Sequence, residues 1–466
     1  MAFNQIRKSN DHIVYDMTEG SPFRAIWKFS MPMMLSMFFQ QFYNFADSII
    51  AGQFAGVDAL AAVGASYPIT ALFIAVATGS CIGASVVVSQ FFGAKQYTSM
   101  KSSVSTCLIS LASIAVILTV VGLVICDPLM RLLQTPNNIF ADSALYLRVY
   151  IFGLLFLFIY NAATAVYNAL GNSRTPLYFL IFSSVLNVIL DYVFVAYFHM
   201  GVAGVAWATF IAQGLASVLA VLNLLTKLRS IEPGVKYQLF DMELLKCISR
   251  VAIPSIFQQS FISVGQLFVQ GLINSYGSDV VAGYSSAFKV NTLAVMTMNT
   301  MASALSSYTA QNIGAGKMDR IKSGYYTSIG ITMVFLVVLV SAFLIYAEPI
   351  ISIFVEQNQS EKVIEVGAAF IRTVSPFYFL LMFKILTDGI LRGAGDMRDF
   401  MIATFSDLIL RVIFSYIFAP LFGYSGIWWA YPVGWGAGAA FSVTFLLRGR
   451  WKKQLIPLES KKNETL

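Results

Sequence analysis

The chain has 466 residues, of which 58% are hydrophobic and only 11% are charged, and its mean hydropathy is +0.73. Soluble proteins carry about 25% charged residues, so this composition excludes a soluble enzyme, a disordered chain and a secreted disulfide-rich module. The net charge of +7 is not concentrated in a basic patch interleaved with aromatic residues, so we expect no nucleic-acid partner. The class that remains is a helical membrane protein with many spans.

Twelve apolar segments are long enough to cross a bilayer as helices, which takes about 20 residues each. Their continuous apolar character favours helices over the alternating strands of a barrel. We therefore predict an all-α membrane protein with twelve transmembrane helices. In chain order they occupy residues 25–50, 60–88, 104–126, 144–170, 177–198, 202–225, 251–274, 281–308, 324–346, 367–391, 401–422 and 426–447.

The distribution of Lys and Arg predicts how these helices are oriented, because basic residues gather in cytoplasmic loops. With both termini in the cytoplasm, the only basic residues in outer loops are Arg131, Arg148, Lys362 and Arg372. We therefore predict a multi-pass protein of the cell membrane with a cytoplasmic N-terminal segment, 1–24, and a basic cytoplasmic tail, 448–466. The N-terminal segment lacks a short apolar core with a cleavage site, so we expect no removable signal peptide.

The two halves of the sequence repeat each other. The first predicted helix contains SMPMMLSMFFQQ, with Pro32, and the seventh contains VAIPSIFQQS, with Pro254; later, ALGNSRTP is matched by RGAGDMRD. Such repeats are typical of secondary transporters. We predict an N-lobe at 25–225, a linker at 226–250 and a C-lobe at 251–447. No complete phosphate-binding loop motif is present, so we expect no cofactor and an ion gradient as the source of energy.

Two acidic residues lie in predicted spans of the N-lobe without a basic residue at helical spacing from either of them. A charge at the bilayer centre costs roughly 2.5–3.5 kcal/mol, so such residues indicate a functional site. Asn187 and Asp191 share one helix face, and Asp47 and the Thr209 hydroxyl could complete a set of oxygen ligands. These groups suit a proton or a hard cation such as Na⁺. The alternative is that each acid is neutral and only joins helices; we favour the ion site.

Charged residues of the C-lobe occur at helical spacing. Asp407 and Arg411 are four residues apart, as are Lys384 and Asp388. They could form structural ion pairs or contact a substrate, and the sequence leaves both alternatives open. Lys289 has no acid at helical spacing and could face a cavity. Asn161 and Thr164 form a polar stripe on one predicted helix of the N-lobe. They could contact a substrate or join neighbouring helices, and the sequence leaves both alternatives open.

Together these features resemble the multidrug and toxic compound extrusion (MATE) family over nearly the whole chain. The resemblance is carried by the twelve helices, the six-plus-six repeat, the run MPMMLSMFFQQFYNFADSIIAGQ, the Asn187-x3-Asp191 pair, and the loops LGNSRTP and RGAGDMR. It implies two six-helix lobes around a central cavity that opens alternately to either side. It also implies export of amphipathic, often cationic, drug-like compounds in exchange for a cation, by a protein that is not an enzyme. We expect a monomer in the lipid bilayer.

The resemblance also implies roles for particular residues. Asp47, Asn187, Asp191 and Thr209 match positions that bind the coupling ion, H⁺ or Na⁺, and Pro32 matches a proline at which the first helix bends. The seventh helix lacks the acid that some members carry there, so we predict that the coupling ion binds in the N-lobe. The residues predicted to line the substrate cavity are Gln40, Tyr43, Asn161, Thr164, Gln259, Gln266, Lys289, Lys384, Asp388 and Arg411.

Two other functions fit parts of the sequence. A flippase for a lipid-linked anionic precursor belongs to the same superfamily, and Lys289, Lys384 and Arg411 could hold its head group. The small number of arginines in the spans argues against it. An intramembrane aspartyl protease is suggested by the GAGD sequence that ends at Asp396, but this acid falls in a short loop that we predict to be cytoplasmic.

Overall fold

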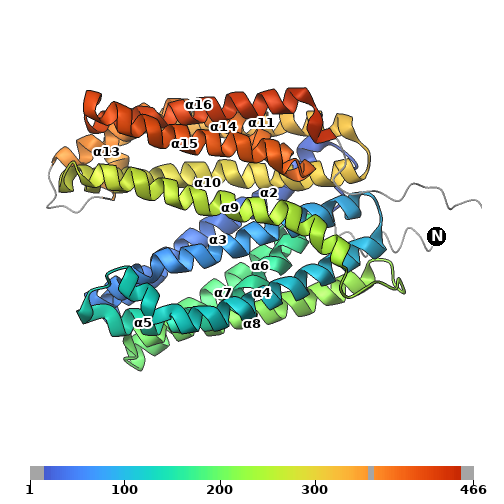
Figure 1. The fold of residues 1–466 in the computed structure, drawn as a ribbon, viewed down its shortest axis with the longest axis horizontal. Helices are drawn as coiled ribbons and strands as arrows, with labels where there is room; N and C mark the ends of the chain where they lie inside the picture. Colours follow the sequence, from blue (N-terminus) through green and yellow to red (C-terminus); the bar gives the residue numbers. More distant parts are fainter. Residues whose placement is uncertain (1–14, 355–360, 453–466) are drawn as a thin grey trace, which may run out of the picture. The chain divides into compact units, whose positions relative to one another are not determined.

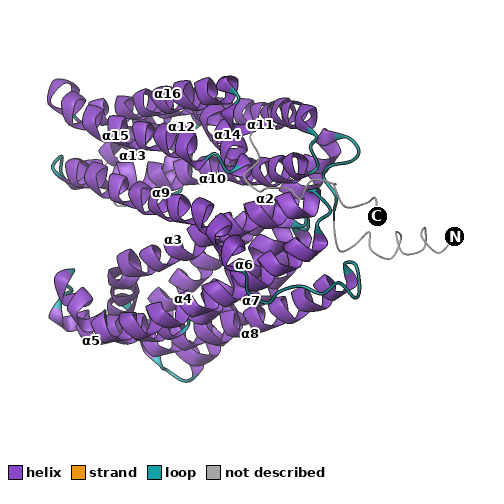
Figure 2. Cartoon of the chain, turned by 45° about the vertical axis from the view of Figure 1, so that its right-hand side comes forward, coloured by secondary structure: helices purple, strands orange, loops and turns teal. Residues whose placement is uncertain are grey.

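The computed structural model describes residues 15–354 and 361–452 (Figure 1). In this part of the chain, helices are the only regular secondary structure (Figure 2). The first half contains α2 (Pro22–Ile50), the π-helix η1 (Ala51–Ala55), α3 (Val57–Gly93), α4 (Tyr97–Leu132), α5 (Asn137–Phe152), α6 (Leu154–Ala169), α7 (Arg174–Asp191), the π-helix η2 (Tyr192–Tyr197) and α8 (Gly201–Ser230). The second half contains α9 (Met242–Asn274), α10 (Ser278–Gly314), α11 (Met318–Ile345), α12 (Ala347–Ser352), α13 (Glu361–Val374), the 3-10 helix η3 (Ser375–Phe377), α14 (Tyr378–Ala394), α15 (Met397–Phe422), α16 (Tyr424–Arg448) and the 3-10 helix η4 (Arg450–Lys452).

The all-α prediction is confirmed, and a long helical stretch lies at each of the twelve predicted places. Two of these stretches are interrupted: α5 and α6 are bent by 48° at Gly153, and η3 contains Pro376 between α13 and α14, where proline removes a backbone donor. By length and composition, eight helices of the described chain can cross a membrane, or nine with α5 and α6 joined. The helices α2, α9 and α10 are long enough but are not among the helices that are also apolar enough by this criterion.

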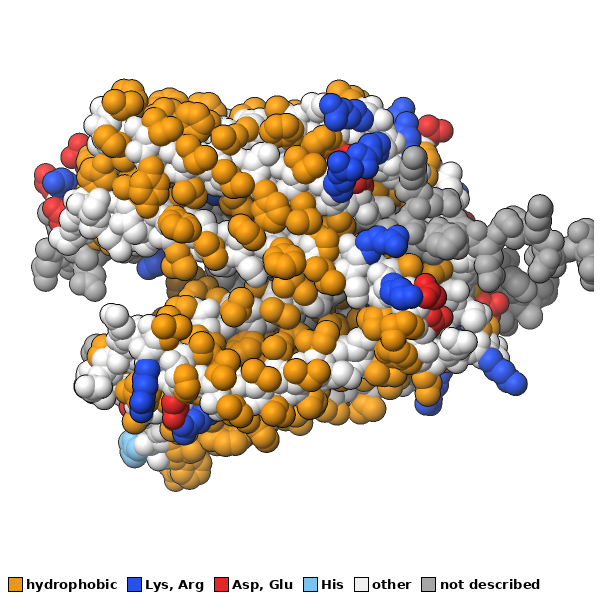
Figure 3. All heavy atoms as spheres, in the orientation of Figure 1, with side chains coloured by type: hydrophobic (Ala, Val, Ile, Leu, Met, Phe, Trp, Pro, Cys, Tyr) orange, Lys and Arg blue, Asp and Glu red, His pale blue; other side chains and the backbone are white. Residues whose placement is uncertain are grey.

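The surface agrees with a bilayer environment. On the face shown in Figure 3, hydrophobic side chains cover the middle of the helices, and Lys and Arg gather near the helix ends. On α4, for example, Ile117, Val120 and Val124 are 60%, 60% and 75% exposed. Exposed apolar surface of this extent is unfavourable in water but favourable in lipid. The chain is therefore a multi-pass membrane protein.

The chain forms two compact units that do not coincide with its two halves. Among the described residues, unit 1 comprises Tyr15–Asp16 and Lys28–Ile256, and unit 2 comprises Met17–Trp27 and the chain from Phe257 onward. The division falls inside α9, and the non-helical link between the halves is limited to residues 231–241. Residues 1–14 and 453–466, which belong to the predicted N-terminal segment and basic tail, lie outside the described residues.

The first residues of α2 and the segment before it are held by unit 2. The backbone N–H of Met17 donates to Gln311 Oε1 over 3.0 Å, and the Arg320 guanidinium donates to the carbonyls of Met17, Glu19 and Gly20. The first turns of α9, in contrast, pack in unit 1. A Cβ atom added to Gly79 of α3 would lie 2.6 Å from the backbone nitrogen of Ile256, so only glycine allows this approach.

In unit 2, α10 and α14 approach closely through two glycines four residues apart. A Cβ atom on Gly389 would lie 2.6 Å from the carbonyl oxygen of Ala302, and one on Gly393 would overlap the carbonyl of Ser306. Small residues at this spacing let membrane helices pack backbone against backbone. This packing fixes the position of α14, which carries Lys384 and Asp388.

We expect Gly393→Ala to destabilise the protein, because the new methyl group meets backbone atoms that cannot rotate away. Overpacking of this kind typically costs about 1–3 kcal/mol, which exceeds the intrinsic helix gain of alanine over glycine. The measurement is the midpoint of thermal unfolding of the purified protein in detergent. Gly330→Ala on α11 is the matched control, since its Cβ would have no neighbour within 4 Å. Equal midpoints for the two variants would contradict the packing argument.

Candidate functional site

Unit 1 brings together the four residues predicted to bind an ion. Asp47 comes from α2, Asn187 and Asp191 from α7, and Thr209 from α8. Asp191 is completely buried and Asn187 is 2% exposed, whereas Asp47 and Thr209 are partly buried. The α7 residues share a face because they are four positions apart, as the sequence predicted.

The amide of Asn187 connects α7 to α8. With its nitrogen toward Asp191 and its oxygen toward Thr209, every polar atom of the amide has a partner. The nitrogen then donates to Asp191 Oδ2 over 2.7 Å, and the oxygen accepts from the backbone N–H and the hydroxyl of Thr209 over 3.1 and 3.2 Å. Asn187 therefore orients the Asp191 carboxyl and leaves its other oxygen open.

The two acids face each other. The Oδ1 atoms of Asp47 and Asp191 are buried and have no hydrogen-bond partner among the described residues, and the two carboxyl groups lie within hydrogen-bonding reach of each other. No Lys or Arg of the described chain forms an ion pair with either acid. Two carboxyl groups can share such a contact only if one carries a proton or a cation lies between them. A facing pair of carboxyl groups can therefore hold a proton or a small cation.

Each acid is followed by a π-helix, which the sequence did not predict. The π-helix η2 begins directly after Asp191, and η1 begins one turn beyond Asp47. The two π-helices contact each other and α8, around a small apolar cluster of Ala51, Val195 and Val205. Wider helical turns of this kind are frequent at functional sites. The segments AGQFA and YVFVAY carry no composition signal for them.

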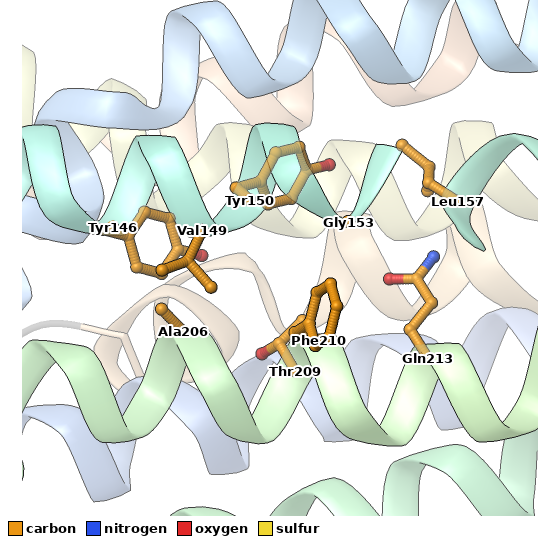
Figure 4. A pocket seen from close by; sticks show the side chains of 9 residues that line it. All are labelled: Tyr146, Val149, Tyr150, Gly153, Leu157, Ala206, Thr209, Phe210 and Gln213. Atoms are coloured by element: carbon orange, nitrogen blue, oxygen red, sulfur yellow. The ribbon is translucent and has the colours of Figure 1, made fainter. Parts of the chain in front are cut away.

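Tyrosines surround this site on the side of α5 (Figure 4). A cavity of about 20 Å³ lies between α5 and α8 and is lined by Tyr146, Tyr150, Thr209 and Gln213 with apolar neighbours. This volume holds about one water molecule. The side chain of Tyr43, which was predicted to line a cavity, is partly buried near Thr209. Tyr146 and Gln213 were not predicted, because an isolated aromatic or amide in an apolar helix gives no spacing signal.

Other predicted residues of unit 1 make contacts along their own helices. Gln40 donates to Asn44 over 3.4 Å, and the amide of Asn161 donates to the Leu157 carbonyl over 2.8 Å. Thr164 lies on the same helix as Asn161 and is partly buried. Their role in substrate binding stays a prediction.

Pro32 lies inside α2, as the sequence predicted, and interrupts its hydrogen bonds because proline has no N–H. The Ser173 hydroxyl donates to the carbonyl of Phe29 over 2.6 Å, just before the proline. A side chain of the LGNSRTP loop thus satisfies a backbone group near this break.

Unit 2 contains a larger cavity, of about 320 Å³, lined by residues of α9, α10, α14, α15 and α16. Four charged residues form a network in its wall. The Lys384 ammonium lies 3.0 Å from Asp388 Oδ2 and 3.6 Å from Asp407 Oδ2, and Arg411 lies 2.7 Å from Asp407 Oδ1. The ion pairs within each helix agree with the predicted spacing, and the contact from Lys384 to Asp407 joins α14 to α15.

The surroundings of this network are polar and aromatic. The Ser442 hydroxyl donates to Asp388 Oδ1 over 2.5 Å, and the Arg411 guanidinium lies 5.0 Å from the centre of the Tyr431 ring. Gln259 and Gln266, predicted from the seventh helix, line the same cavity. Lys289 is exposed on α10 and does not belong to the cavity wall.

Asp396, the acid of the GAGD sequence, has a structural role. Asp396 caps α15, where its carboxylate accepts from the backbone N–H of Asp399 over 3.4 Å. Burial and the nearby Asp399 carboxylate raise the pKa of Asp396. This N-cap explains the acid without protease chemistry.

A sequence model of the MatE family matches the chain twice, at residues 32–193 and 254–417. The two matches begin at Pro32 and Pro254, the prolines that correspond in the internal repeat. Together they cover well over half of the chain.

Curated relatives align over almost the full length. The probable multidrug resistance protein YpnP of Bacillus subtilis is 28% identical over 445 residues, which cover 94% of this chain and 98% of that protein. The multidrug export protein MepA of Staphylococcus aureus is 21% identical over 444 residues, which cover 94% and 97%.

Solved structures show the same fold. A MATE family transporter of the MOP superfamily, in an outward-facing conformation, has a TM-score of 0.86 with 26% identity and covers 95% of this chain and 98% of that one. A MOP superfamily transporter from Pyrococcus furiosus has a TM-score of 0.87 with 25% identity over 95% and 99%, and the reverse polarity of its binding pocket is described as suggesting a different function.

Proposed function

Because this chain belongs to the MATE family of multidrug efflux transporters, we propose that it is a secondary antiporter that exports amphipathic compounds in exchange for H⁺ or Na⁺. The observation that carries the proposal is the facing pair of Asp47 and Asp191, whose free oxygens have no basic partner among the described residues. A pair of buried acids needs a cation for stability, and its occupancy can follow an ion gradient.

The mechanism follows from the position of the pair. When H⁺ or Na⁺ binds from the outside, Asp47 can remain beside Asp191, with Asn187 and Thr209 as further ligands for Na⁺. When the ion leaves on the inside, the two carboxylates repel each other, and α2 can bend at Pro32 to separate them. Substrate and ion are exchanged if each favours a different state, which requires no direct contact between them.

The remaining features belong to the same proposal. Both termini lie in the cytoplasm of a monomer in the cell membrane, because this orientation leaves few basic residues outside. The substrates are small drug-like molecules, as the names of the relatives suggest, and cationic ones are expected from the family. The protein needs no cofactor besides the ion and catalyses no covalent reaction.

The test is dye efflux from proteoliposomes that contain the purified protein. A pH gradient and a Na⁺ gradient are imposed separately, with the electrical potential clamped. We expect one of the two gradients to drive efflux above that of empty liposomes. The proposal fails if neither gradient changes the rate for any of a panel of cationic, neutral and anionic dyes.

Thr209→Val should weaken the binding of the coupling ion without unfolding the protein. Valine keeps the shape and the backbone N–H that Asn187 accepts from, but removes the hydroxyl at 3.2 Å. Loss of one hydrogen bond corresponds to about 1 kcal/mol, so we expect the ion concentration for half-maximal efflux to rise about fivefold. Thr226→Val on the same helix is the control, since this hydroxyl only donates to the Leu222 carbonyl. The same half-maximal ion concentration in both variants would show that the Thr209 hydroxyl does not contribute to ion binding.

A further inference from the structure

The cavity of unit 2 contains more basic than acidic groups. Lys384, Arg392 and Arg411 line it together with Asp388 and Asp407. Both acids are already satisfied by the protein: Asp388 by Lys384 and Ser442, and Asp407 by Arg411 and Lys384. Their charge is therefore not available to an incoming cation unless Lys384 or Arg411 moves away.

Two of the basic side chains have N–H donors that no described acceptor satisfies. Among the described residues, the Arg392 side chain donates only to the Ser303 hydroxyl, over 3.4 Å, and forms no ion pair with a carboxylate. The Nε atom of Arg411 is buried and has no hydrogen-bond partner among the described residues. The negative end of the α14 dipole can offset part of the Arg392 charge, because this residue lies in the last turn. The dipole of α14 does not provide an acceptor for the Nε of Arg411, in the interior of α15.

A cavity in the membrane with excess positive charge and open guanidinium donors favours an anion. Leaving such a charge without a counter-ion is costly in a low-dielectric environment. Arginine binds carboxylate and phosphate oxygens with particular strength, because its planar donors match them.

The rest of the wall suits the apolar part of a ligand. Phe288, Phe400, Tyr431 and Trp435 line the cavity, with Met296 beside them. Its volume of about 320 Å³ lies at the lower end of the range for small-molecule sites, about 300–1,000 Å³. A compact amphipathic molecule fits this combination of aromatic and basic groups.

We propose that the cavity of unit 2 binds amphipathic substrates through an anionic group, a carboxylate or a phosphate, held by Arg392 and Arg411. This inference rests on the proposed transport function and assigns it amphipathic substrates that carry an acid group, in place of the cationic compounds expected from the family. The anionic group could belong to a soluble organic acid or to a phospholipid, because the chemistry of recognition is the same.

Equilibrium binding to the full-length purified protein tests the proposal. The probes are pyrenebutyrate and pyrenebutyl-trimethylammonium, which share an aromatic body and differ in charge, and fluorescent phosphatidic acid paired with fluorescent diacylglycerol in mixed micelles. We expect an acid probe to bind at least about tenfold more tightly than its uncharged or cationic counterpart. We expect Arg392→Gln to remove most of that preference.

The variants are chosen so that the fold survives. Arg392→Gln breaks no ion pair of the described chain, and Arg411→Lys keeps a charge beside Asp407 while removing the Nε donor. Lys322→Gln, an exposed residue of α11 in the same unit, is the control for a change in net charge. Thermal unfolding confirms that each variant is folded.

Each outcome decides the question. A preference for pyrenebutyrate that Arg392→Gln abolishes supports the proposal with a soluble acid as substrate, and the same result for phosphatidic acid alone supports it with a lipid. Tighter binding of the ammonium probe, or acid binding that neither arginine variant changes, overturns it. Binding is measured without a gradient, so a failure of ion coupling leaves this test intact. Gradient-driven efflux of a cationic dye without acid binding would overturn this inference alone.

Discussion

Replacing Asp191 by Asn should reduce gradient-driven efflux by about 5- to 150-fold, the range of typical coupling energies between two sites. Asparagine keeps the shape and can still accept from Asn187, but it can neither take up a proton nor offer a charge to Na⁺. Substrate binding should be unchanged, since Asp191 does not line the cavity of unit 2. The measurement is the initial rate of dye efflux from proteoliposomes, with dye binding measured in parallel.

Asp47→Asn should have the same effect, because the two acids act as a pair. Asp58→Asn is the matched control, as this acid is exposed at the start of α3 in the same unit. Full gradient-driven efflux by either Asp47→Asn or Asp191→Asn would show that the coupling ion binds elsewhere.

Asp407→Asn should strongly destabilise the protein. The side chain is 4% exposed and neutralises both Arg411 and Lys384, so the amide would leave the buried Arg411 without a counter-charge and Lys384 with Asp388 alone. Removing one partner of a buried ion pair costs about 3–5 kcal/mol. We expect a large drop in the thermal unfolding midpoint in detergent.

The control for this variant is Asp127→Asn, whose ion pair with Arg148 is 2.7 Å long but exposed on both sides. Exposed pairs contribute about 0–1 kcal/mol, so this change should barely move the midpoint. The double variant Asp407→Asn with Arg411→Gln should recover part of the loss, since one unpaired charge disappears. If Asp407→Asn is as stable as the control, the network does not support the fold and Asp407 is open to another role.

The sequence predicted contacts within a single helix correctly, because these depend only on the spacing of residues along it. It predicted the Asn187–Asp191 face and the pairs of α14 and α15, because residues four apart must lie side by side. Contacts between helices do not follow from spacing along the chain. The sequence therefore predicted neither the ion pair of Lys384 with Asp407 nor the hydrogen bond from Ser442 to Asp388. Spacing also gave no position for Lys289, which has no acid four residues away; its side chain is exposed outside the cavity of unit 2, and a role in substrate binding stays a prediction.

The sequence also did not predict the π-helices or the boundaries of the two units. Both depend on how apolar side chains pack, and many apolar sequences pack equally well. The repeat predicted equivalent halves, yet it gave no indication that α2 and α9 each begin in one unit and continue in the other.

This exchange of helix beginnings has a consequence for how the protein can be divided. A cut in the link 231–241 would leave the first fragment with Met17–Trp27, which packs on α10 and α11, and the second with the start of α9, which packs on α3. Each fragment would expose surface that its own residues do not cover. Split versions of this transporter should therefore assemble only when both fragments are co-expressed, although each carries six of the twelve helices.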